Sequence, residues 1–117
     1  MSFKWREKAW CAVRVLCDES VPRQLTDMLS GHHVSTVQGM GWAGLEDGEI
    51  LRRAGGNIDA FITWAPNLER EQNLAALSFG VVQIVVRPGR FDLNRLALEL
   101  GMALNRVSPG RLVRVSG

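Results

Sequence analysis

The chain has 117 residues, which suffices for one domain, and 46% of them are apolar, which excludes long disorder. The formal net charge of only +2 argues against a protein that coats nucleic acid by charge alone. The two cysteines form no CxxC or Cys/His cluster, so we expect neither a structural zinc site nor a disulfide framework. A chain without disulfides is typical of the reducing cytoplasm, which we expect to be its location.

The first residues are charged and contain no long apolar run. They therefore do not have the pattern of a signal peptide or a membrane span, and we expect no membrane association. We interpret residues 1–11 as an amphipathic lead-in segment and residues 12–117 as one domain.

In the first half of the chain, strands and helices alternate in the predicted order. The β-branched segment Ala12–Cys17 predicts a strand, and Val21–Ser30 predicts a helix with Pro22 near its start. Val34–Val37 predicts a short strand, which a glycine-rich turn follows. Asp47–Ala54 then has apolar residues on one helical face and ends at a Gly-Gly pair.

The second half continues the alternation. Ala60–Thr63 predicts a third strand, and Glu69–Ser78 predicts a helix. Val81–Val86 is almost wholly apolar, which is typical of a central strand buried on both faces. Asp92 caps a long helix that runs to about Asn105, and Leu112–Val115 predicts the last strand.

This alternation predicts the fold class. Strands separated by helices imply right-handed crossovers, so we expect an α/β fold: a single three-layer domain with a mostly parallel five-stranded sheet flanked by helices. Such sheets place functional groups beyond the carboxyl ends of their strands, near the point where strand order reverses.

Acidic residues follow the first strand and begin the second helix. Asp18 and Glu19 come directly after the first strand, although Asp18 could instead cap the next helix. Asp47 and Glu49 lie in a helical first turn, where the helix dipole alone favours acids. If Asp18 and Asp47 converge, two carboxylates and water would suffice to bind Mg²⁺ or Mn²⁺.

Polar residues after the later strands are candidates for substrate contact. Thr63 and Asn67 follow the third strand and offer a hydroxyl and an amide. Arg87 follows the fourth strand and could contact phosphate, or could be a solvated turn residue.

Several segments, in this order and spacing, resemble a bacterial PIN-like family. Leu16–Pro22 resembles its "L-x-D-E-N-L-P" opening, and His32–Val37 resembles its "G-H-D-V-x-T-V" strand. Gly41–Leu51 resembles "G-x-x-G-x-x-D-x-E-I-L". Phe61–Leu68 resembles "F-V-T-x-D-x-N-L", and Glu71–Leu74 continues it as "Q-Q-N-L". The match extends from about residue 13 to the C-terminus.

The resemblance implies a small ribonuclease toxin of a toxin–antitoxin module. Such a hydrolase holds Mg²⁺ or Mn²⁺ with acids and activates water to cut RNA. By matched position, Asp18 and Asp47 would be the metal ligands, with Glu19 and Glu49 as neighbouring catalytic acids. The implied partners are RNA and a cognate antitoxin, and a homodimer is a further alternative.

One position departs from the family pattern. Ala65 stands where the family carries an aspartate after the third strand, so the metal site should bind its ion more weakly. Three explanations remain open: the chain has lost activity and kept a binding role, another acid such as Asp59 or Glu69 substitutes, or the alanine is an engineered change.

Two other functions compete with the nuclease. The first is a catalytically inactive interaction module, for which Trp5, Trp10 and Trp42 would be candidate contacts. The second is a phosphoacceptor signalling domain, which we rank last. It needs an aspartate where Ala65 stands and a lysine late in the sheet, and no lysine follows Lys8.

Overall fold

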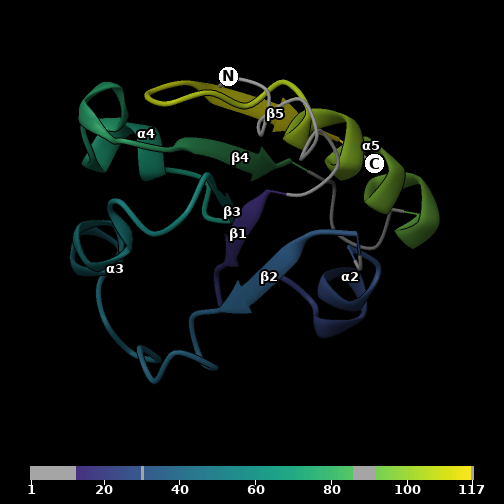
Figure 1. Cartoon of the computed structure of the whole chain (residues 1–117), viewed down its shortest axis with the longest axis horizontal. Coiled ribbons are helices and arrows are strands. Elements are labelled where there is room, and N and C mark those ends of the chain that lie inside the picture. Colours follow the sequence, from purple (N-terminus) through teal and green to yellow (C-terminus); the bar gives the residue numbers. More distant parts are fainter. Residues whose placement is uncertain (1–12, 30, 86–91, 117) are drawn as a thin grey trace, which may run out of the picture.

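Five parallel strands form the middle layer of the structure (Figure 1), a computed structural model that describes residues 13–29, 31–85 and 92–116. Their order across the sheet is β2-β1-β3-β4-β5, and every neighbouring pair is parallel. The strands are β1 (Arg14–Cys17), β2 (His33–Thr36), β3 (Ala60–Thr63), β4 (Gly80–Ile84) and β5 (Leu112–Val115).

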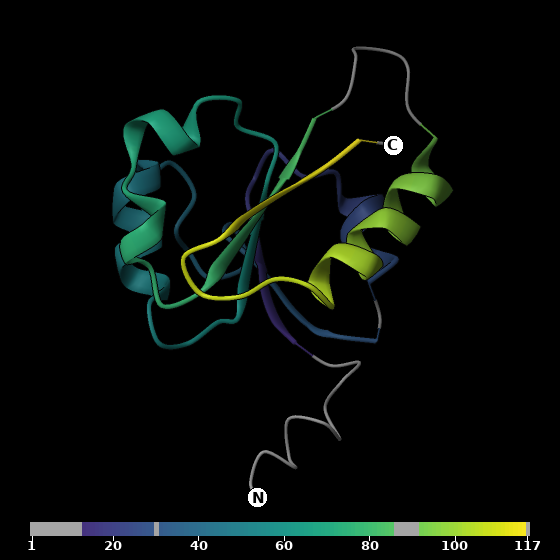
Figure 2. The same ribbon diagram turned by 90° about the horizontal axis from the view of Figure 1, so that it is seen from above.

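Helices cover both faces of the sheet, as Figure 2 shows from above. One face is covered by α2 (Arg23–Asp27) and α5 (Leu93–Leu104). The other is covered by α3 (Asp47–Ala54), α4 (Leu68–Glu71) and the short 3-10 helix η1 (Leu74–Ala76). The predicted fold class, a three-layer α/β domain with a parallel sheet, is confirmed.

The alternation of side chains along the strands builds two cores. In β3, Phe61 packs toward α3 and α4 while Ile62 packs toward α2 and α5, and both are fully buried. Val81 and Val82 divide in the same way in β4. Strands covered on both faces need apolar residues at every position, which explains the continuous apolar runs in the sequence.

The predicted helix over Glu69–Ser78 is wrong, because two short helices occupy this segment. After α4 ends, Gln72 has extended backbone angles (φ −130°, ψ 145°), and η1 follows. In one continuous helix, Leu68 and Leu74 would lie about 120° apart around the axis, so they would not lie side by side on one face. The break lets both side chains pack into the core beneath α3 and α4.

Several element boundaries also differ from expectation; for example, β2 is His33–Thr36 rather than Val34–Val37. The first helix is shorter than the predicted Val21–Ser30 and has Pro22 as its N-cap. Strand β4 spans Gly80–Ile84 instead of the predicted Val81–Val86, so it begins one residue earlier. A Cβ at Gly80 would lie 2.1 Å from Val107 Cγ2 and 2.7 Å from the Ser108 carbonyl oxygen. Glycine therefore lets the loop before β5 cross close to the start of β4.

No helix within the described ranges is both long enough and apolar enough to cross a bilayer. The predicted lead-in segment, residues 1–11, lies outside the described residues.

Candidate functional site

The strand order reverses between β1 and β3, and this creates the expected position for a site. From β1 the chain passes to α2 on one face, and from β3 it passes to α4 on the opposite face. The two connections therefore diverge at the carboxyl ends of these strands, which is where such folds place their sites. Asp18 and Thr63 lie at this point and are joined by a hydrogen bond.

The Asp18 carboxylate is held by two hydroxyl groups. Ser20 Oγ donates to Asp18 Oδ2 at 2.7 Å, and Thr63 Oγ1 donates to the same oxygen at 3.3 Å. The two hydroxyls accept in turn from the backbone N–H groups of Trp64 (3.2 Å) and Ala65 (3.0 Å). Only 8% of Asp18 is exposed, so this network fixes a largely buried carboxylate in one orientation.

The network also resolves the capping alternative. The N-cap of α2 is Pro22, and no side chain makes a capping hydrogen bond there. Asp18 and Ser20 are therefore bound to the loop after β3 rather than to the helix that follows them.

Asp47 lies in the first turn of α3, within electrostatic reach of Asp18. Burial raises the pKa of the Asp47 carboxyl, and the charges of Asp18, Glu71 and Glu46 raise it further. The packing of α3 on α4 explains the approach of Glu71, since a Cβ at Gly48 would lie 3.2 Å from the Gln72 side chain. Sequence reasoning brought Asp18 and Asp47 together but missed Glu71.

The other two predicted acids are engaged elsewhere. Glu19 Oε1 accepts from the backbone N–H of Gly44 at 3.2 Å, which ties it to the glycine turn before α3. The Glu49 carboxylate bonds to Arg52 and Arg53 on its own helix, and these contacts lower its pKa to about 2. Glu49 thus forms a local ion-pair group on α3.

Backbone and amide groups occupy the surroundings of Ala65. Gln83 Nε2 donates to the carbonyl oxygens of Ala65 (2.9 Å) and Pro66 (3.3 Å). Arg114 Nε donates to Gln83 Oε1 at 3.1 Å, and the Arg114 guanidinium forms an ion pair with Glu69. Glu69 is therefore neutralised by an arginine and does not replace the missing aspartate.

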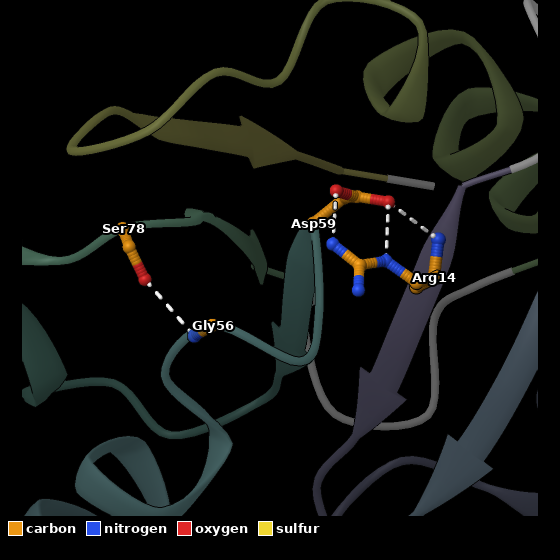
Figure 3. Close-up of polar contacts among 4 residues, drawn as sticks. All are labelled: Arg14, Gly56, Asp59 and Ser78. Carbon is orange, nitrogen blue, oxygen red and sulfur yellow. Dashed lines mark hydrogen bonds and ion pairs between the residues drawn. The ribbon is translucent and has the colours of Figure 1, made fainter. Parts of the chain in front are cut away.

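Asp59 cannot replace it either, because it lies at the opposite edge of the sheet (Figure 3). Asp59 immediately precedes β3, and its carboxylate accepts from the backbone N–H of Arg14 at 2.9 Å and pairs with the Arg14 guanidinium. Nearby, Ser78 Oγ accepts from the Gly56 N–H, also at the amino ends of the strands.

Polar side chains, including those of Asp18 and Thr63, form a row across the carboxyl ends of the strands. Thr63 is level with Gln83, and Gln83 is level with Arg114. Asp18 follows Cys17, the register partner of Ile62, and so is level with Thr63. The row faces the side of the sheet covered by α3 and α4, and hydrogen bonds link each pair of neighbours directly or through the Ala65 backbone.

The remaining residues singled out from the sequence are Asn67, Arg87 and three tryptophans. Asn67 is exposed at the N-terminus of α4 and makes no capping bond with its side chain. Arg87, Trp5 and Trp10 lie outside the described residues. Trp42 is half-buried and packs against the core beneath α3 and α4.

A pocket of about 450 Å³ opens beside the site, at the carboxyl end of β4. Four of its lining residues offer apolar surface: Trp64, Pro66, Ile84 and Val85. The others are the charged or amide side chains of Glu69, Arg70, Gln83 and Arg114. The pocket therefore combines an aromatic wall with a polar one.

The donors available for a metal ion are two carboxylates. Within the described ranges, no group of three or more His, Cys, Asp or Glu residues is arranged to hold a metal ion. The charge of Asp18 contributes, after burial, to raising the pKa of Asp47, so these two acids would form a weaker site in which water supplies the other ligands of Mg²⁺ or Mn²⁺.

Comparisons of the chain with protein-family models, with curated proteins and with solved structures found no significant match.

Proposed function

We propose that this chain is a PIN-like ribonuclease, dependent on Mg²⁺ or Mn²⁺, whose activity is impaired because Ala65 replaces a carboxylate. The observation that supports the proposal is the position of Asp18 where the strand order reverses, together with the pKa of Asp47, which burial raises and the charges of Asp18, Glu71 and Glu46 raise further. Acidic groups that disfavour one another's charge in this way are suited to a divalent cation. The resemblance to toxins adds a cognate antitoxin as the proposed partner.

The protein's own groups would position the reactants. A bound divalent ion would make its water a stronger nucleophile and offset charge on the phosphate. Ser20 and Thr63 hold the Asp18 carboxylate in one orientation, so it needs little rearrangement on binding. Asp47 releases its proton more readily once a cation neutralises its acidic neighbours.

The test compares cation binding and RNA cleavage in four variants. We expect Ala65→Asp to bind Mn²⁺ about ten-fold more tightly in calorimetry, because an added carboxylate raises affinity for hard cations. We expect the same variant to cleave single-stranded RNA faster. Asp47→Asn should abolish both, and Asp18→Asn should do the same.

Glu49→Gln is the matched control for Asp47→Asn. Both acids lie in the first turn of α3, but Glu49 is paired with Arg52 and Arg53. Its substitution should leave Mn²⁺ binding unchanged. The nuclease proposal fails if neither the parent protein nor Ala65→Asp binds Mn²⁺ or cleaves RNA.

A second candidate, a catalytically inactive interaction module, is favoured by two observations. Gln83 and backbone groups fill the surroundings of Ala65 without a carboxylate. In addition, Leu98 and Met102 lie one turn apart on α5 and are 67% and 55% exposed, which gives the helix an apolar outer strip.

Sedimentation tests this candidate. If the α5 strip is an interface between copies, the parent protein should form a dimer at micromolar concentration and Leu98→Gln should be monomeric. Met40→Gln is the control, because Met40 is, like Leu98, an exposed apolar side chain, but it lies in the glycine turn. A parent protein that is monomeric and co-purifies with no partner contradicts the module.

A further inference from the structure

The outer edge of strand β5 carries main-chain groups that the sheet does not use. The carbonyl oxygens of Arg111 and Val115 accept from N–H groups of β4, so alternate residues of β5 face β4. By the same alternation, the main-chain groups of Leu112 and Arg114 point away from the sheet. Within the described ranges, these N–H and C=O groups make no hydrogen bond. Such an edge can pair with another extended chain.

The edge is accessible and has apolar side chains on both faces of the sheet. Figure 2 looks onto β5, drawn in yellow, and no described helix or strand lies in front of it. Leu112 is half-buried and packs against the core beneath α3 and α4. Val113 is half-buried and packs against the core beneath α2 and α5. The exposed part of each side chain is therefore available to one residue of an added strand.

Arginines flank these two apolar residues along the chain. Arg111 is exposed and has no ion-pair partner in the part of the chain that the structure describes. Arg114 pairs with Glu69, but the exposed Arg70 lines the same pocket as both, so these three charges sum to one net positive charge. A spacing of three along an extended chain places Arg111 and Arg114 on opposite faces of the sheet. The edge thus presents positive charge on each face.

This charge decides which kind of partner fits the edge. Two copies of the chain paired through β5 would bring the same arginines of both copies to one seam, and like charges on neighbouring strands are destabilising. An acidic segment would instead place opposite charges side by side. The other outer strand, β2, is less available, because the Thr36 carbonyl oxygen already accepts from the Met40 N–H.

From these features we propose that the outer edge of β5 binds an extended acidic segment of a partner protein, which adds a strand to the sheet. Residues opposite each other on neighbouring strands share a face. The segment therefore fits with acids opposite Arg111 and Arg114 and with apolar residues opposite Leu112 and Val113, in the order acid, apolar, apolar, acid. The proposal goes beyond the nuclease and does not depend on it, because neither Asp18 nor Asp47 contributes to this edge.

The experiment measures binding of a short acidic peptide to the full chain. A fluorescein-labelled peptide, Ser-Glu-Val-Val-Glu-Ser, is titrated with protein, and fluorescence anisotropy reports the Kd. Replacing both glutamates by lysine should weaken binding about ten-fold or more, because two attractive pairs become repulsive. We expect Arg111→Gln to weaken binding about three-fold. Arg23→Gln is its matched control and should have no effect, because Arg23 is also exposed but begins α2, beside the other end of the sheet.

Hydrogen exchange separates strand addition from attraction between charges alone. At a peptide concentration ten times the Kd, the amide hydrogens of Leu112 and Arg114 should exchange about ten-fold more slowly than in the free protein, because an added strand accepts from them. The amide of Val34 is the control. It faces outward from β2, at the opposite edge of the sheet, and its exchange should not change.

Three results would overturn the proposal: no binding of the acidic peptide by the parent protein, equal affinities for the glutamate and lysine peptides, or unchanged exchange at Leu112 and Arg114 in the bound protein. Equal losses in Arg111→Gln and Arg23→Gln would also contradict it. A parent protein that dimerises and thereby slows exchange at Leu112 and Arg114 would assign the edge to a second copy. An oligouridylate that binds more tightly than the peptide and displaces it would assign the edge to nucleic acid.

Discussion

Replacing Thr63 by valine tests the network that holds Asp18. The substitution keeps the shape of a side chain that is 1% exposed but removes its hydroxyl. Asp18 then loses one of its two hydroxyl donors, and the Ala65 N–H loses its acceptor. A hydrogen bond to a charged group contributes about 1.5–3 kcal/mol, and the orphaned N–H adds to the loss. We therefore expect the free energy of unfolding to fall by about 3 kcal/mol.

Urea denaturation and a thermal melt measure this change, which corresponds to a decrease in Tm on the order of 10 °C for a domain of this size. Thr36→Val is the matched control: Thr36 ends the outer strand β2, and among the described residues its Oγ1 accepts from the exposed turn N–H of Gly39 alone. It should cost under about 1 kcal/mol, because water can replace its partner. A loss for Thr63→Val that is no larger than the loss for Thr36→Val would refute the reasoning.

Three further predictions concern stability and reactivity. Gly80→Ala should destabilise the fold by about 1–3 kcal/mol, because the added methyl group overpacks the site. Gly101→Ala, in α5 where no atom lies close to the added methyl group, should instead stabilise the fold by about 1 kcal/mol. Urea denaturation measures both changes. Because the pKa of Asp47 is raised in the folded state, the parent protein should become more stable as pH falls from neutral toward the ordinary carboxyl range. Asp47→Asn should be more stable than the parent at pH 7 and lack this rise in pH-dependent melts. Burial raises the pKa of the Cys17 thiol to about 11. In a Cys11→Ser variant at pH 8, a thiol reagent should therefore label Cys17 only after the protein unfolds. Rapid labelling of the native protein would contradict this burial.

The fold followed from the sequence because the alternation of strands and helices allows few arrangements. The apolar run Val81–Val86 predicted a central strand, and Ala60–Thr63 predicted a third strand. Both strands are buried on two faces. The helix predicted over Glu69–Ser78 was wrong because the helical spacing of apolar residues indicates only which face of a helix would be buried. It does not show where the helix breaks. In the structure Leu68 and Leu74 reach the same core only across a break.

The site was predictable where it depends on strand ends and not where it depends on helix packing. Asp18 was expected at the edge of the sheet because it follows a strand, and it lies there. Glu71 approaches Asp47 only because α4 is short, so the predicted longer helix concealed it. Asp59 was considered as a substitute acid, and it is near Ala65 in sequence. A strand separates the two residues, however, so they lie at opposite edges of the sheet.

The polar row across the sheet has a consequence for the pairing of the strands. Strands β3 and β4 are buried on both faces, so an alternation of polar and apolar residues cannot specify how they align. A shift of one residue would turn Thr63 and Gln83 toward the apolar layer under α2 and α5, and would leave each without its hydrogen-bonding partners. The residues that surround the candidate site thus also select one alignment of the central strands, so substitutions there would affect both the site and the uniqueness of the fold.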